Sequence, residues 1–214
     1  MSIIKKLLRK TLDISGLRGL NVLRNSEYLK STGWFNSCKK KNAVDSSGNA
    51  IPWMPYPAID FIERRLSKDM SVFEYGSGNS SIWLADRVGK VVSCEHDHKW
   101  HELVNKMIPE NVHLVYRDLD SGEYIAEISK YRKEFDVIII DGRERVKCVN
   151  NAVGALKDDG VIILDDSFRE EYRAAKEFLR ENGFKEIEIT GPTPIYFNAS
   201  TSAIFYRSDN CFNI

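Results

Sequence analysis

The sequence predicts an α/β domain in which helices cover both faces of a mostly parallel sheet. From Pro57 onward, short runs rich in β-branched and aromatic residues alternate with amphipathic helical patterns. One run, residues 135–140, is almost entirely apolar, as is typical of a central strand buried on both faces. The chain that follows the fifth strand is long enough for two more strands, which we expect to pair as an antiparallel edge. The expected fold is therefore doubly wound, with seven strands.

Each expected element follows from these patterns in order along the chain. The first five strands are expected at residues 71–75, 91–95, 112–116, 135–140 and 161–164, separated by helices at 80–88, 98–107, 122–131 and 146–156. Asp97 is suited to cap the second of these helices, with Trp100, Val104 and Met107 on its inner face. A helix at 170–182 ends at Gly183, and strands at 184–189 and 202–207 complete the sheet.

Length and composition indicate one ordinary domain. The 214 residues are 43% hydrophobic and 29% charged, which is sufficient for a substantial core. We divide the chain into an N-terminal extension, residues 1–50, whose end (39–50) has the composition of a loop, and a domain at residues 51–214. The formal net charge is zero, so no overall electrostatic attraction favours nucleic acid as a partner. We expect the binding partner to be a small molecule instead.

The N-terminal region is nevertheless basic. Residues 1–41 contain ten Lys or Arg and two acidic residues, and residues 3–10 place apolar side chains at helical spacing between basic ones. This amphipathic helix can pack on its own domain or lie on an anionic membrane surface. It lacks the continuous apolar region of a signal peptide, and the four cysteines show no CxxC spacing. We therefore expect a cytoplasmic protein, with peripheral contact at the inner membrane surface as an alternative.

A glycine-containing loop, residues 76–81, follows the first expected strand directly. Its glycines permit a tight turn and the close approach of a ligand at the carboxyl edge of the sheet, beside a helix start. The second strand ends in Glu95, whose carboxylate suits the two hydroxyls of a ribose. Dinucleotide enzymes share these features, but their GxGxxG fingerprint has a third glycine where this sequence has Ser81. The loop therefore favours a cofactor without a pyrophosphate.

The segment Phe73–Gly78 resembles motif I of class I S-adenosylmethionine-dependent methyltransferases, and the similarity extends over roughly residues 52–207. The resemblance implies S-adenosylmethionine as the cofactor, with the glycine loop around its methionine part, Glu95 at the ribose and Asp118 at the adenine. The cofactor-binding residues that it implies are Glu74, Tyr75, Gly76, Ser77, Gly78, Asn79, Ser80, Glu95, His96, Asp118 and Asp141.

Three further acids follow later strands. Asp141 ends the fourth strand and the pair Asp165-Asp166 ends the fifth, so their carboxylates are expected to converge where the methyl group points. This arrangement is similar to the metal-dependent catechol O-methyltransferase type, although Asp166 replaces an Asn and Glu144 stands where that type has a lysine. We predict Asp141 and Asp165 as catalytic residues, and all three acids as ligands of Mg²⁺. Alternatively, Asp141 serves the cofactor and the pair caps the next helix.

Two other features have a functional and an ordinary interpretation. His96, His98 and His101 could suggest a metal site, but a ribose-side loop and an exposed helix face explain them better. The segment Trp53–Pro57 is rich in aromatic residues and proline, and is either a lid over the ligand or a packed connection.

The predicted function is S-adenosylmethionine-dependent methyl transfer, with O-methylation of a small molecule or a sugar hydroxyl as the expected reaction. Two alternatives remain. An NAD-type Rossmann oxidoreductase would require the missing third glycine and a nicotinamide pocket. A non-catalytic module that retains the fold could dock on a membrane or a partner, and loss of the glycine loop would have favoured it.

Overall fold

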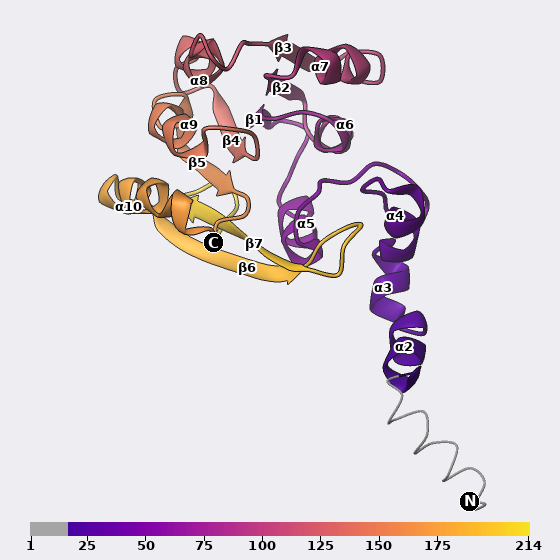
Figure 1. Cartoon of the computed structure of the whole chain (residues 1–214). Helices are drawn as coiled ribbons and strands as arrows, with labels where there is room; N and C mark the ends of the chain where they lie inside the picture. Colours follow the sequence, from indigo (N-terminus) through magenta and orange to yellow (C-terminus); the bar gives the residue numbers. More distant parts are fainter. Residues whose placement is uncertain (1–16) are drawn as a thin grey trace, which may run out of the picture.

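The computed structural model describes residues 17–214, drawn in Figure 1. The amphipathic helix expected at residues 3–10 lies outside the described residues. The described chain begins with three short helices, α2 (Leu17–Arg24), α3 (Glu27–Ser31) and α4 (Trp34–Lys40), which lead from the N-terminal end to the body of the protein. No helix within residues 17–214 is both long and apolar enough to cross a membrane.

The body contains one seven-stranded sheet. Its strands are β1 (Ser71–Tyr75), β2 (Lys90–Glu95), β3 (Val112–Tyr116), β4 (Phe135–Ile140), β5 (Leu156–Leu164), β6 (Lys185–Pro192) and β7 (Ala199–Tyr206). They are arranged in the order β3-β2-β1-β4-β5-β7-β6. The first five strands are parallel, whereas β7 runs antiparallel to both β5 and β6. The predicted fold class, a doubly wound sheet with an antiparallel edge, is confirmed.

Helices cover both faces of this sheet (Figure 1). One face packs against α8 (Glu123–Ala126), the 3₁₀ helix η1 (Glu127–Lys130), α9 (Arg145–Ala152) and α10 (Arg173–Glu181). The other face packs against α5 (Tyr56–Glu63) and α6 (Asn79–Ala85), while α7 (His98–Val104) contacts β2 and β3. Every residue of β4 is buried, as the apolar run predicted. Burying apolar side chains on both faces is the main stabilising contribution to such a sheet.

Several element boundaries differ from the prediction. Strand β5 begins at Leu156 rather than at residue 161, because Leu156 pairs with Phe135 before the register shifts and regular pairing resumes at Val161. Helix α9 consequently ends at Ala152. The helix expected at 122–131 is the short α8 followed by η1, and the 3₁₀ helix η2 (Glu170–Tyr172) precedes α10.

The inner face proposed for α7 is wrong in part. Asp97 caps the helix as expected, since its carboxylate accepts a hydrogen bond from the backbone N–H of Trp100 at 2.9 Å. Val104 is fully buried, but Trp100 and Met107 are exposed. The physical reason is that α7 lies near the β3 edge of the sheet, where its contacts are with β2 and β3.

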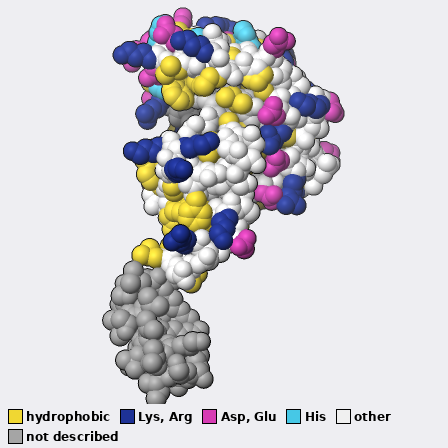
Figure 2. Space-filling view, turned by 90° about the vertical axis from the view of Figure 1, so that its right-hand side faces the viewer, with side chains coloured by type: hydrophobic (Ala, Val, Ile, Leu, Met, Phe, Trp, Pro, Cys, Tyr) yellow, Lys and Arg dark blue, Asp and Glu magenta, His cyan; other side chains and the backbone are white. Residues whose placement is uncertain are grey.

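The segment expected as a loop at residues 39–50 contains the end of α4 and an isolated bridge between Val44 and Ala50. Ala43 and Ile51 belong to the core on the α5 and α6 face. Figure 2 views the side that bears α7, α6 and the N-terminal helices, and shows acidic and basic side chains interspersed across it.

Candidate functional site

The glycine loop lies at the point where the strand order reverses, between β1 and its neighbours β2 and β4. Gly76 has a φ of 99°, which favours glycine, and a Cβ there would lie 3.4 Å from the Asp141 carbonyl oxygen. A Cβ on Gly78, with a φ of 141°, would lie 3.3 Å from the Trp100 ring. The Trp100 ring nitrogen donates a hydrogen bond to the Ser77 carbonyl oxygen at 2.9 Å. Trp100 therefore packs against the loop from α7.

Glu74 lies buried beneath this loop and organises it. Its carboxylate accepts hydrogen bonds from the hydroxyls of Ser80 (2.7 Å), Ser93 (2.5 Å) and Ser81. Burial raises the pKa of Glu74, and the three serine hydroxyls oppose that rise. Glu74 therefore connects β1, β2 and the start of α6 through one carboxyl group.

Ser81, at the position of the missing glycine, has a structural role of its own. Its hydroxyl oxygen accepts a hydrogen bond from the backbone N–H of Gly78 at 3.1 Å while the same side chain contacts Glu74. In a dinucleotide site, loop N–H groups of this kind face the pyrophosphate. Here the Gly78 N–H is already paired within the protein, and an acidic side chain lies next to it.

Glu95 is held rigidly at the end of β2. One carboxylate oxygen accepts the backbone N–H groups of His96 (2.8 Å) and Asp97 (2.9 Å), and the other accepts the Ser77 hydroxyl at 2.8 Å. The His96 ring nitrogen Nδ1 lies 3.0 Å from the first of these oxygens. The buried carboxylate is thus fixed beside the glycine loop, in a position to accept hydrogen bonds from a ligand.

A cavity of about 550 Å³ opens above these residues, a size typical of small-molecule sites. Eight of the predicted cofactor residues line it, namely Glu74, Tyr75, Gly76, Ser77, Ser80, Glu95, His96 and Asp141. Apolar side chains from the segment before α5 and from α5 itself also line it, together with three aromatic residues and four charged ones, namely Trp83, Trp100, Tyr172, Asp97, Arg143, Arg145 and Arg169.

Three predicted cofactor residues do not line the cavity. Gly78 packs against Trp100, and the Asn79 amide donates hydrogen bonds to the Ala43 carbonyl (2.6 Å) and the Asn42 side chain (2.9 Å). Asp118 instead accepts the backbone N–H of Ser121 at 2.7 Å, so its carboxylate stabilises the turn after β3. The other two histidines considered for a metal site with His96, namely His98 and His101, pack edge-on against Tyr116 outside the cavity.

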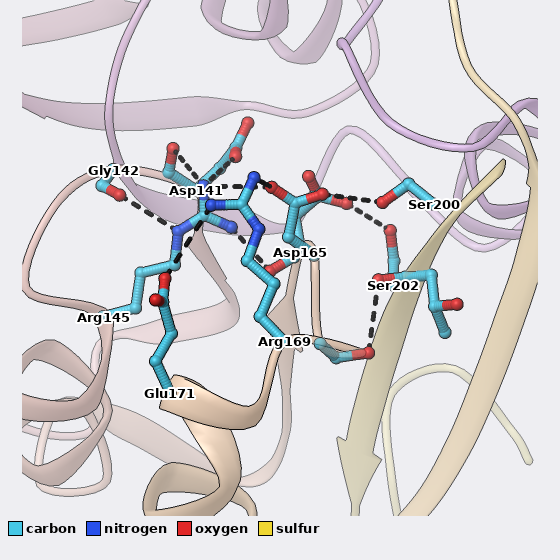
Figure 3. Close-up of polar contacts among 11 residues, drawn as sticks. Asp141, Gly142, Arg145, Asp165, Arg169, Glu171, Ser200 and Ser202 are labelled. Carbon is cyan, nitrogen blue, oxygen red and sulfur yellow. Dashed lines mark hydrogen bonds and ion pairs between the residues drawn. The ribbon is translucent and has the colours of Figure 1, made fainter. Parts of the chain in front are cut away.

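The three acids at the ends of β4 and β5 do converge, but arginines lie between them (Figure 3). The Arg145 guanidinium lies 3.0 Å from the Asp141 carboxylate and 3.9 Å from that of Asp166. Arg169 pairs with Asp166 at 2.5 Å. Asp165 is buried, and one of its oxygens accepts the Ser202 hydroxyl at 2.6 Å.

The structure does not show the predicted magnesium site at Asp141, Asp165 and Asp166. Within the described part of the chain, no cluster of three or more His, Cys, Asp or Glu side chains is placed to hold a metal ion. The physical reason is charge: Arg145 and Arg169 already supply the positive charge that a cation would have supplied to these acids. The donor set does not fit a divalent cation.

Asp141 and Asp165 lie side by side and influence one another's ionisation. Burial raises the pKa of Asp141 to about 6, while the neighbouring Arg145 opposes the rise and Asp166 and Glu74 add to it. Burial and the Asp141 charge raise the pKa of Asp165 well above its ordinary range. The raised pKa of Asp165 favours its protonated form, and Asp141, which lies beside Arg145, is the partner placed to accept a proton.

A second cavity, of about 540 Å³, adjoins the first. Asp141 and Arg169 line both cavities, so the two meet at these side chains. The segment considered as a lid is divided between them: Met54 lines the first cavity and is buried, whereas Trp53 is exposed and lines the second.

Sequence analysis missed three residues of this site. Arg145 and Arg169 follow Asp141 and Asp166 by four and three residues, a spacing at which ion pairs commonly form. That spacing could have identified them. Glu144 stands where a lysine was expected, and the positive charge comes from the next residue, Arg145. Trp100 was assigned to the core, and only the structure places it at the glycine loop.

Comparisons with known proteins agree with this geometry. Residues 73–167 match a family model described as a methyltransferase domain. None of the curated proteins compared with the sequence matches it. Among solved structures, the fold is similar to precorrin-6y C5,15-methyltransferase from Geobacter metallireducens, with 17% identity, coverage of 79% of this chain and 96% of that chain, and a TM-score of 0.56.

Two further structures are similar. Spermidine synthase from Thermotoga maritima is 20% identical over 69% of this chain and 56% of that chain, with a TM-score of 0.55. A structure of precorrin 8W decarboxylase from Methanobacterium thermoautotrophicum is 19% identical over 78% of this chain and 97% of that chain, with a TM-score of 0.55. The chain thus spans 56% of the length of that spermidine synthase, and identities this low establish the fold alone.

These findings confirm the class I methyltransferase fold, and residues 73–167 are similar to a methyltransferase domain.

Proposed function

We propose that the first cavity binds S-adenosylmethionine and that the methyl group is transferred to a hydroxyl of a small molecule, a sugar hydroxyl being one such acceptor, held in the second cavity. The observation that carries this proposal is the meeting of the two cavities at Asp141. An activated methyl group bound on one side of this junction can face an acceptor oxygen on the other side, which is the alignment that an in-line displacement requires.

The charges of the first cavity suit a cationic cofactor. S-adenosylmethionine supplies a methyl group that is already activated on a positively charged sulfur. Glu74 and Glu95 line the cavity and place acidic groups at the ends of the adjacent strands β1 and β2, whereas Arg145 compensates the charge of Asp141. These carboxyl groups favour a cation over a pyrophosphate. An NAD-type oxidoreductase is disfavoured for the same reason, and because Ser81 occupies the Gly78 N–H.

Asp141 has the role of general base in this proposal. As the bond from the acceptor oxygen to the methyl carbon forms, the hydroxyl proton passes to the Asp141 carboxylate and the sulfur leaves as a neutral thioether. Arg145 holds the carboxylate in place through its ion pair and its contacts with the Asp141 and Gly142 carbonyls. Burial and the Asp141 charge raise the pKa of Asp165, which limits the negative charge at the junction.

The cofactor assignment is tested by titration calorimetry of the purified protein. We expect binding of S-adenosylmethionine and of S-adenosylhomocysteine, and no binding of NAD or NADP, because the loop offers no free cradle for a pyrophosphate. Tight binding of NAD with no response to S-adenosylmethionine would overturn the proposal.

Replacing Glu95 by Ala is expected to weaken S-adenosylmethionine binding by about 1.5 to 3 kcal/mol, the range for hydrogen bonds to a charged group. The Glu95 carboxylate is buried and aimed at the cavity, whereas Glu102 on α7 is an exposed acid that does not line it. Glu102→Ala is the matched control and should bind as the wild type does. Equal affinity for the cofactor in Glu95→Ala and the wild type would show that the ribose is held elsewhere.

A further inference from the structure

The second cavity has an aromatic rim built from three separate segments. Trp53 precedes α5, Phe168 follows β5, and Tyr196 lies in the connection between β6 and β7. These side chains are 48%, 58% and 57% exposed, so large apolar faces surround the opening of a polar cavity. The rings of Trp53 and Tyr196 lie 5.8 Å apart with an angle of 30° between their planes, and form one continuous wall.

Helix α4 holds the part of the rim that contains Tyr196. The Trp34 ring nitrogen donates a hydrogen bond to the Tyr196 carbonyl at 3.2 Å, and the Cys38 thiol donates to the Ile195 carbonyl at 2.9 Å. Ile195 itself has a φ of 70°, which is rare and strained for a β-branched residue. Strain of this kind persists only where surrounding contacts maintain it. The rim is therefore fixed in position by contacts with α4.

The floor of the cavity is rich in hydrogen-bond acceptors and almost neutral in charge. Asp141, Asp165 and Asp166 contribute carboxyl groups, joined by polar side chains from the β6 to β7 connection and from β7, namely Thr193, Asn198 and Ser200. Arg145 and Arg169 lie against the acids and compensate them. The two guanidinium groups therefore offset most of the charge of the acids, and burial raises the pKa of Asp165. Neither a cation nor an anion gains a large electrostatic advantage here.

We infer that the second cavity is a subsite for a neutral, polyhydroxylated ring, that is, a sugar, with its flat face against Trp53 and Tyr196 and its hydroxyls toward the acids. This inference rests on the proposed function and names the acceptor class for it. A sugar ring carries C–H groups on its faces, which pack on aromatic rings, and hydroxyl donors at its edges, which carboxylates accept. The hydroxyl nearest Asp141 is the one placed for methylation.

Two other ligand classes fit the same residues less well. An amine could stack its charge on the aromatic rim, but the arginines have already compensated the acids that would attract it. A planar catechol-like ring could stack on the rim, yet it would bring only two hydroxyls to a floor with at least six polar side chains. The rim and the floor together therefore select a ligand that is apolar on a face and donor-rich at its edges.

Saturation-transfer NMR on the full chain tests this inference. The probes are the methyl glycosides of glucose, mannose, galactose and rhamnose, with putrescine and catechol as representatives of the other two classes. We expect contact signals from at least one glycoside, strongest for the C–H groups of one ring face, and none of comparable strength from putrescine or catechol. Trp53→Leu is expected to weaken glycoside binding about fivefold, the size of a single aromatic contact.

Tyr28→Leu is the matched control, because Tyr28 on α3 is similarly exposed and lines neither cavity. It should leave the glycoside signals unchanged. Equal losses in Trp53→Leu and Tyr28→Leu, or stronger contact from putrescine or catechol, would overturn the inference. S-adenosylmethionine binding is measured on the same samples. Cofactor binding without any glycoside contact overturns the sugar subsite alone, whereas glycoside contact without cofactor binding overturns the proposed cofactor alone.

Discussion

Asp141→Asn is expected to lower kcat by about 10²- to 10⁴-fold, the range for loss of a general base. Asparagine keeps the size of the side chain and can still accept a hydrogen bond from Arg145, but its amide cannot take the acceptor proton. The measurement is the initial rate of methyl transfer from labelled S-adenosylmethionine to the glycoside that binds. Cofactor affinity, measured in parallel by calorimetry, should change far less than the rate.

The pH profile gives an independent check on Asp141. Because the base must be ionised, the rate in the wild type should rise with pH through about 6, where burial places the pKa of Asp141. Above that pH the rate should reach a plateau. A flat profile between pH 5 and 8 would contradict the assignment.

Asp165→Asn is the matched comparison. Burial and the Asp141 charge raise the pKa of Asp165 and so favour its protonated form, which an amide resembles because it too can donate to Asp141. We expect this variant to retain activity within about tenfold. Its pH limb should lie close to that of the wild type, because the amide is neutral, as the protonated Asp165 is, and can still donate to Asp141. Equal inactivity of Asp165→Asn and Asp141→Asn would contradict the assignment of Asp141 as a base that acts alone.

The fold was predictable from sequence where periodicity is unambiguous. Residues 135–140 have no polar interruption except Asp136, and they form a fully buried strand at the expected positions. The start of β5 was not predictable, because residues 156–160 include two exposed aspartates and a glycine and join the sheet only through the pairing of Leu156 with Phe135. Such pairing depends on tertiary contacts rather than on local pattern.

The site residues likewise divide into those that local motifs predicted and those that depend on tertiary contacts. The glycine loop directly follows β1, and Glu95 is the last residue of β2. Local motifs therefore sufficed to place both at the first cavity. The partner of Asp165 did not follow from any motif, since Ser202 comes from a strand 37 residues further along the chain. Asp118 follows β3 as expected, but its carboxylate is used by the local turn. Position after a strand does not by itself direct a side chain into the cavity.

Arg145→Ala is expected to lower the free energy of unfolding at pH 8 by about 3 to 5 kcal/mol, the range for leaving a buried charge without its partner. The Arg145 side chain is 9% exposed, and it contacts the Asp141 carboxylate as well as the carbonyl oxygens of Gly142 and Asp165. Removing it leaves Asp141 and Asp166 with one nearby guanidinium, that of Arg169. Urea unfolding followed by circular dichroism measures the change.

Arg169→Ala is the control for Arg145→Ala, because it removes a positive charge that is not buried. Arg169 is 46% exposed, so water replaces much of what it contributes, and its loss should lower the free energy of unfolding by about 1 kcal/mol or less.

The Arg145→Ala effect should also depend on pH. Because Arg145 holds down the pKa of Asp141, the difference from the wild type should be largest at alkaline pH and should shrink as the pH falls to about 6 and Asp141 becomes protonated in both proteins. A loss that is the same at pH 5 and pH 8 would mean that Arg145 stabilises the protein through its carbonyl contacts alone, and not through the acid cluster.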